Sequence, residues 1–258
     1  MKKRLLLACL TLLSATLYAQ NKEYTHGVFW GRLILADTIN SKFKWELYLQ
    51  KRTQSAGTGN VFAEPHFLSV WPWLNYKLNS NTKISVSPVG YFVSEVFFNS
   101  VDDVKPGVKE WRSSIRLENE QKLSWFNYSN RYSVEYRLRD LAYNGNYQPN
   151  WRVRYQAKIE KPLRNVFSKD KPLSVFVSEE VFIQFGKAVA SNPNIFDQNR
   201  VNIGAGYEIF KNIRFSASYL NIIQERVSGK EIDNANALWV VLDFENVFSQ
   251  FKKRKIRQ

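Results

Sequence analysis

The sequence predicts an all-β protein, an antiparallel up-and-down transmembrane β-barrel of about ten to twelve strands that follows a cleaved signal peptide. Three observations support this prediction. The chain begins with an export signal, most of its later segments alternate apolar and polar residues, and it is rich in aromatic residues. No apolar run after the signal reaches 18 residues, so we expect no transmembrane helix. This combination is typical of an outer-membrane barrel, whose strands alternate lipid-facing and lumen-facing side chains.

The first twenty residues have the three parts of a secretory signal. Residues 2–4 are basic, residues 5–17 are mainly apolar, and Ala19 is a small residue at the expected cut. A transmembrane anchor needs roughly 20 consecutive apolar residues, which this run does not reach. We therefore expect residues 1–19 to be a cleaved signal peptide.

The single cysteine, Cys9, lies within this signal. Residues 6–9 resemble a lipobox, but they stand in the middle of the apolar run, too early for the usual cut. Loss of Cys9 with the signal would exclude disulfides, thiolate metal sites and cysteine nucleophiles from the mature chain. The mature chain then divides into a β-barrel domain over residues 20–248 and a basic C-terminal tail over residues 249–258.

The positive charge of the chain is concentrated at its two ends. The formal net charge is +14, of which three basic residues lie in the signal and five in the last ten residues. The body is therefore only mildly basic. Because the protein is exported, we expect no nucleic-acid partner. The expected partners are outer-membrane lipids or lipopolysaccharide and the barrel-assembly machinery, and the expected state is a monomer. The expected location is the bacterial outer membrane.

Strict alternation identifies the strands, because successive side chains of a strand point to opposite faces. In one example Trp151, Val153 and Tyr155 share a face, while Arg152 and Arg154 share the other. Short turns and longer loops alternate between such segments, as in outer-membrane barrels. We count eleven such segments. Bacterial single-chain barrels normally have an even number of strands, so the strand count stays open between ten and twelve. The eleven segments are 24–36, 42–54, 64–79, 82–98, 109–123, 126–141, 150–161, 173–187, 198–210, 212–226 and 235–248.

The polar faces of the middle strands carry many arginine and glutamate residues. If the aromatic faces point to lipid, these charges fill the lumen. One interpretation is a salt-bridged plug, because buried charges must be paired. The other is a polar pore or an anion site for an acidic solute, because the arginine fork matches carboxylate and phosphate. The candidate lumen residues are Arg112, Arg116, Glu118, Arg131, Glu135, Arg137, Arg152, Arg154, Glu180 and Arg200.

Two further sets of residues bear on function. We expect Trp71, Trp73, Phe97 and Phe98 to belong to an aromatic girdle at the level of the lipid headgroups. The chain has two histidines, His26 and His66. These permit a lipid-modifying hydrolase, but no serine motif accompanies them. We assign no catalytic residue, no metal site and no cofactor.

Several segments together resemble the exported family labelled domain of unknown function 2490. The sequence Phe-Asp-Gln-Asn-Arg at 196–200 is the most specific of them. The resemblance implies an outer-membrane barrel and no particular activity. The chain departs from the usual pattern at its end, because Phe248 and Phe251 are followed by the tail instead of ending the chain. The matching segments are 110–114, 132–139, 151–155, 178–186, 196–201, 204–207 and 219–221.

The leading interpretation is therefore an outer-membrane barrel of unknown specific role, either a narrow channel or a structural membrane protein. Two alternatives stay open. One is an outer-membrane hydrolase that modifies lipids, and the other is a soluble periplasmic β-barrel or sandwich that binds a ligand.

Overall fold

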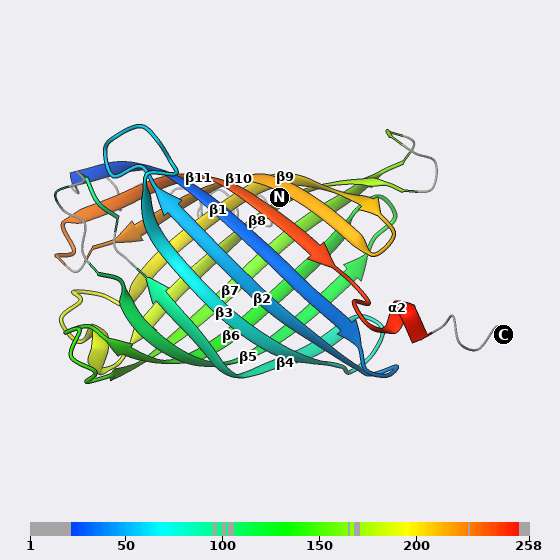
Figure 1. Ribbon diagram of the computed structural model, residues 1–258, viewed down its shortest axis with the longest axis horizontal. Coiled ribbons are helices and arrows are strands. Elements are labelled where there is room, and N and C mark those ends of the chain that lie inside the picture. Colours follow the sequence, from blue (N-terminus) through cyan, green and yellow to red (C-terminus); the bar gives the residue numbers. More distant parts are fainter. Residues whose placement is uncertain are drawn as a thin grey trace, which may run out of the picture.

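The computed structural model describes residues 22–94, 97–99, 102, 106–164, 166–167, 171–226 and 228–252. Within these ranges eleven strands form one closed barrel (Figure 1). The predicted signal peptide and the tail beyond residue 252 lie outside the described residues. The strands are β1 (Lys22–Thr38), β2 (Phe43–Gln54), β3 (Glu64–Lys77), β4 (Thr82–Ser94), β5 (Val108–Lys122), β6 (Asn127–Asp140), β7 (Gln148–Leu163), β8 (Leu173–Phe185), β9 (Phe196–Phe210), β10 (Ile213–Glu225) and β11 (Glu231–Phe244). Two short helical turns complete the described elements, η2 (Lys187–Val189) and α2 (Ser249–Lys252).

The barrel closes between its first and last strands. Every consecutive pair of strands is antiparallel, whereas β1 and β11 pair in parallel, from Lys22 opposite Glu231 to Leu35 opposite Phe244. This arrangement follows from the strand number, because alternate strands reverse direction and an odd total leaves the first and last pointing the same way. The eleven segments predicted from alternation are thus confirmed, and the first segment is a regular strand of the barrel.

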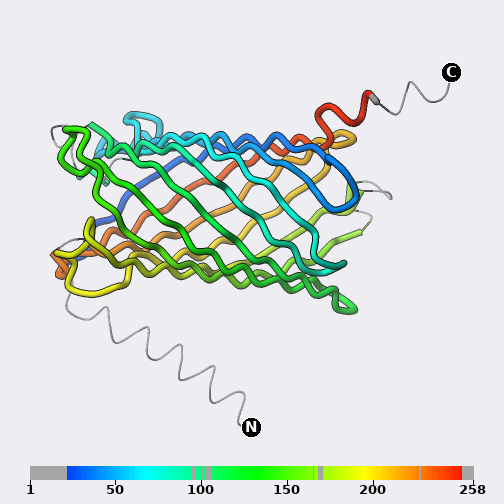
Figure 2. Tube along the Cα trace, turned by 90° about the horizontal axis from the view of Figure 1, so that it is seen from below, coloured from blue at the N-terminus to red at the C-terminus, as the bar shows by residue number. Residues whose placement is uncertain are grey.

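The two ends of the barrel differ in their connections. Connections 39–42, 78–81, 123–126 and 211–212 are short and lie at one end, here called the turn end, which they share with the longer connection 164–172. The opposite end, here called the loop end, carries connections 55–63, 95–107, 141–147, 186–195 and 226–230. The chain enters β1 at the loop end and leaves β11 at the turn end, where α2 follows (Figures 1 and 2).

The outer face of the barrel is apolar, as predicted. On β5 to β7 the side chains that alternate with the charged residues are exposed or half-buried. Aromatic rings from neighbouring strands pair on this face, with 4.8 Å between the ring centroids of Tyr136 and Trp151 and also between those of Tyr91 and Trp111. Such cross-strand aromatic pairs stabilise a sheet. Exposed outward residues include Trp111, Ile115, Leu117, Tyr132, Val134, Trp151, Tyr155, Ile159, Val201, Ile203, Tyr219 and Leu238.

The prediction that Trp71 and Trp73 belong to an outer girdle is wrong. Both indoles are buried inside the barrel, where they form a cluster with Phe92. The guanidinium carbon of Arg116 lies 3.8 Å from the centroid of the Trp73 ring, so the aromatic faces cover lumen charges. Gly90 provides the space, since a Cβ atom there would lie 2.5 Å from Cδ1 of Trp71.

Phe97 and Phe98 are also buried, against the prediction that placed them in the girdle. They belong to the connection between β4 and β5, which turns inward at the loop end. The Phe97 ring stacks on His26 and contacts His66, with centroid distances of 4.8 and 4.4 Å. The backbone N–H of Phe98 donates to Oε1 of Gln54 at 3.0 Å. Phe97 thereby joins an apolar cluster that includes Val28, Trp30, Leu220 and Ile222.

Candidate functional site in the lumen

Two fully buried carboxylates organise the loop-end half of the lumen. Glu110 and Glu135 are each 1% exposed. Glu110 accepts hydrogen bonds from Arg112 at 2.7 Å and from Arg137 at 2.7 and 2.9 Å. These bonds satisfy both oxygens of the carboxylate, which a buried charge requires.

Glu135 binds three arginines at once. Arg152 Nη2 lies 2.6 Å from Oε2 of Glu135, and Arg154 Nη1 lies 2.7 Å from Oε1. Arg112 Nη1 completes the group at 3.5 Å and so connects Glu135 to Glu110. The alternation of the strands dictates this geometry, because Glu135 and Arg152 stand directly opposite each other on β6 and β7.

The ion pairs extend across five adjacent strands as one connected set, here called the lumen network. Arg152 also pairs with Asp197 at 3.4 Å, and Arg154 pairs with Glu180 at 2.7 Å. Arg131 shares the same oxygen of Glu180 at 2.9 Å. The lumen network comprises Glu110, Arg112, Arg131, Glu135, Arg137, Arg139, Arg152, Arg154, Glu180 and Asp197.

The structure brings seven of the ten predicted lumen residues into the lumen network. The other three also line the lumen. Arg116 and Glu118 form a separate pair at 3.1 Å, closer to the turn end, and Arg200 lines the interior. Arg200 makes no ion pair with any described residue. Glu110, Arg139 and Asp197 join the lumen network without having been among the ten.

A cavity of about 720 Å³ occupies the turn-end half of the lumen. We call it the vestibule. Its walls reach from the turns at 40–42 and 79–81 inward to Trp71, Arg154 and Glu180. The deeper members of the lumen network, Glu110, Arg112, Glu135, Arg137, Arg152 and Asp197, do not line it. The vestibule thus ends where the buried ion pairs begin.

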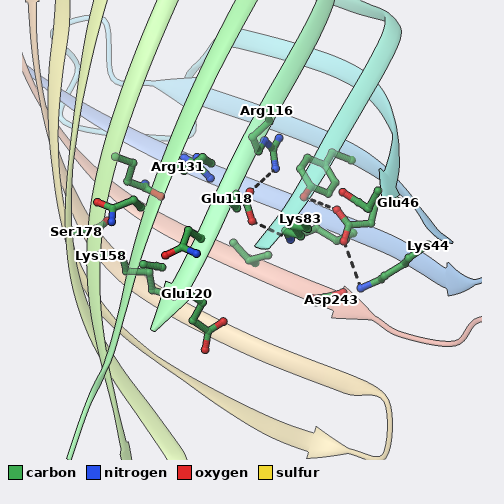
Figure 3. Close-up of a pocket in the computed structure, with 18 of the residues that line it drawn as sticks. Lys44, Glu46, Lys83, Arg116, Glu118, Glu120, Arg131, Lys158, Ser178 and Asp243 are labelled. Carbon is green, nitrogen blue, oxygen red and sulfur yellow. Dashed lines mark hydrogen bonds and ion pairs between the residues drawn. The ribbon is translucent and has the colours of Figure 1, made fainter. Parts of the chain in front are cut away.

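Three of the five acidic side chains that line the vestibule, Glu46, Glu118 and Glu180, form ion pairs, two of which Figure 3 shows. Glu118 bridges Arg116 at 3.1 Å and Lys83 at 2.8 Å. Glu46 lies 3.3 Å from Lys44 and accepts the hydroxyl hydrogen of Tyr48 at 2.7 Å. Among the described residues that line the vestibule, eleven are lysine or arginine and five are aspartate or glutamate. The vestibule therefore presents a positive potential to solutes.

Three lumen arginines lack a carboxylate partner among the described residues: Arg32, Arg52 and Arg200. Aromatic rings surround them instead. The guanidinium carbon of Arg52 lies 3.5 Å from the centroid of the Trp30 ring, and that of Arg200 lies 4.3 Å from the centroid of Phe182. Sequence reasoning missed Arg32 and Arg52, although both occupy the inward parity of their strands, which was the available signal.

The loop end contains the two histidines, but neither sits in a hydrolase arrangement. His26 Nε2 lies 2.7 Å from Oδ1 of Asp233, and the same oxygen accepts a hydrogen bond from Arg226 at 2.6 Å. Burial lowers the pKa of Arg226, but its hydrogen bond to Asp233 and the negative charge there outweigh burial, so the pKa lies above its usual value. The hydrogen bonds found among the described residues include none between a histidine and a serine.

Neither a metal centre nor a helical membrane span is evident in the part of the chain that the structure describes. No cluster of three or more histidine, cysteine, aspartate or glutamate side chains there has the arrangement needed to hold a metal ion. No helix in the described ranges is long and apolar enough to cross a membrane.

The fold and the lumen define a closed β-barrel with an apolar exterior and a charged, largely paired interior. The chain belongs to the family described as "Protein of unknown function (DUF2490)", whose model matches residues 28–233. This match confirms the resemblance seen in the sequence. No match was found among curated proteins. A solved structure, that of the NanC porin, is similar at 13% sequence identity and a TM-score of 0.48, covering 85% of this chain and 97% of that chain.

Proposed function

We propose that this protein is an integral outer-membrane barrel with a lumen closed at the loop end and a vestibule open at the turn end. In this role it is a structural or solute-binding membrane protein and not an open pore. The observation that carries the proposal is the inversion of polarity across the barrel wall. Outward side chains such as Trp111 and Ile115 are exposed, whereas Glu110 and Arg112 on the same strand are buried.

A soluble barrel would place its apolar side chains inside and its charges outside. In this barrel, exposed apolar residues form the outer face of most strands. In water these residues would make a very large exposed apolar patch. The strands have 12 to 17 residues, and a membrane-spanning strand needs about 9–11. A lipid bilayer therefore accounts for the exterior that the sequence builds.

Exposed aromatic residues do lie at the turn end, but they are not the residues predicted to form the girdle. Trp125, Phe167, Phe210 and Phe248 lie in or beside the connections of that end, and each is more than half exposed. Aromatic side chains favour the interface between hydrocarbon and water. Their position supports a membrane boundary at the turn end.

The closed lumen separates this proposal from a general diffusion pore. Eleven strands give a narrow interior, and side chains can fill an interior of that size. In the loop-end half, the lumen network and the inward-turned Phe97 occupy the space between the strands. The vestibule is thus accessible from one side, as suits a binding site better than a conduit.

Fractionation of cells that produce the full chain tests the membrane role. We expect the protein in the outer-membrane fraction, resistant to carbonate and urea washes and released by detergent. An unboiled sample should also migrate faster than a boiled sample in a denaturing gel, because closed barrels resist unfolding by detergent. Recovery of the protein in the soluble periplasmic fraction would contradict the proposal and favour a soluble binding protein.

A further inference from the structure

Arg32 is held rigidly at the floor of the vestibule by contacts that leave part of its guanidinium free. Its Nε and Nη2 atoms donate to Oε1 of Gln50 at 3.0 and 2.6 Å. The rings of Trp239 and Tyr48 lie 4.9 and 5.4 Å from its guanidinium carbon. The Nη1 atom has no hydrogen-bond acceptor among the described residues, and Arg32 lines the vestibule. A donor pair is therefore presented to the cavity in a fixed plane.

Arg200 is the second cation at this floor. It stands directly opposite Glu180 on the neighbouring strand. Glu180, however, is engaged by Arg131 and Arg154. The guanidinium of Arg200 lies instead over Phe182 and at 5.1 Å from the centroid of Trp30. It has no hydrogen-bond acceptor among the described residues, and its Nε atom is buried.

The indoles that lie beside the two arginines are in contact with each other. Trp30 and Trp239 meet edge to face with 5.5 Å between ring centroids, Arg200 lies near the first indole and Arg32 over the second. Three other arginines of the lumen, Arg131, Arg116 and Arg154, repel the positive charge of Arg32. An anion at this point would relieve the repulsion and accept the free N–H groups.

We propose that Arg32 and Arg200 form a binding site for the oxyanion of a small solute, a carboxylate or a phosphate, that enters the vestibule from the turn end. The guanidinium fork matches the geometry of both oxyanions. Three of the five acids that line the vestibule already pair with other cations, and the cations outnumber the acids by eleven to five. The excess positive charge draws an anion inward. The cavity of about 720 Å³ admits a solute of small-molecule size. This inference rests on the proposed function, because it requires the barrel to be folded with an open turn end.

Calorimetric titration of the refolded full-length barrel in a neutral detergent tests the site. The ligands are benzoate and inorganic phosphate, with benzamide as the uncharged counterpart of benzoate. The variants are Arg32→Gln and Arg200→Gln. Arg214→Gln is the matched control, because Arg214 also lines the vestibule but pairs with Glu160 at 3.3 Å. A gel shift between boiled and unboiled samples verifies that each variant is folded.

We expect at least one of the two anions to bind, with benzamide binding at least tenfold more weakly than benzoate if benzoate is the ligand accepted. Each of Arg32→Gln and Arg200→Gln should weaken anion binding about tenfold or more, and Arg214→Gln less than threefold. Benzoate binding without phosphate binding assigns the site to carboxylates, and the reverse assigns it to phosphates. The inference is overturned if neither anion binds to the folded barrel, or if the three variants bind alike. A chain that gives no heat-dependent gel shift in any form would instead count against the barrel itself.

Discussion

Glu180 and Arg200 stand directly opposite each other on β8 and β9, yet Glu180 gives its carboxylate to Arg131 and Arg154. Strand register alone would pair the two residues. The competition between three arginines for one carboxylate leaves a cation unpaired at the floor of the vestibule. The sequence has more arginines than acids on the inward faces of β6 to β9, and the structure places one of the unpaired arginines, Arg200, at the floor of the vestibule.

Removal of the central carboxylate of the lumen network should destabilise the barrel strongly. Glu135→Ala leaves Arg112, Arg152 and Arg154 buried without their shared partner, and breaking a buried ion pair costs about 3–5 kcal/mol. Urea unfolding of the protein in lipid vesicles measures the change. The matched control is Glu179→Ala. Glu179 is an exposed residue on the outer face of β8, and its carboxylate accepts a hydrogen bond from Asn199. Equal stability of the two variants would contradict the assigned role of Glu135.

A methyl group at Gly90 should disturb the aromatic cluster in the lumen. Its Cβ would lie 2.5 Å from Cδ1 of Trp71 and 2.8 Å from Cε2 of Phe92. Overpacking of this kind costs about 1–3 kcal/mol. Unfolding followed by tryptophan fluorescence detects it, and Gly31→Ala is the control, since its nearest neighbour is a Phe29 ring atom at 3.3 Å. A Gly90→Ala barrel as stable as the control would mean that Trp71 does not pack inside.

The strand number predicts that the two ends of the barrel domain lie on opposite sides of the membrane. Because β1 and β11 are parallel, the chain enters at the loop end and leaves at the turn end. An epitope inserted just before Lys22 and one at the C-terminus should therefore differ in their accessibility to antibody on intact cells. An epitope in the 141–147 connection is the control and should behave like the first. Equal accessibility of both ends would require an even number of strands.

Much of this fold is readable in the sequence because one rule, alternation, acts on every strand. The segment 109–123 corresponds to β5 within one residue at each end, and its Arg112 and Arg116 face inward as predicted. The seven members of the lumen network that were predicted lie on strands with clear alternation. These faces bring arginine and glutamate residues of neighbouring strands together, so a salt-bridged plug could be predicted from the sequence.

Other features of the structure could not be predicted from alternation. Trp71 and Trp73 share a face, but the pairing of β3 with both neighbours shifts register, so the parity that decides inside from outside could not be read reliably. Phe97 lies in a connection, where no periodicity applies, and its inward position reflects contact with His26 and His66. The unpaired state of Arg200 arises from competition between side chains on different strands, which only the assembled barrel reveals.

The closed lumen of a membrane-inserted barrel is the central claim, and current recorded across planar bilayers tests it most directly. The refolded wild-type chain should give no steady open-pore conductance. A variant with Arg112, Glu135 and Arg152 all replaced by serine, which removes the side chains that fill the loop-end half, should conduct and thereby show that barrels insert under the same conditions. Stable, uniform conductance steps from the wild-type protein would contradict the claim and identify the barrel as an open channel.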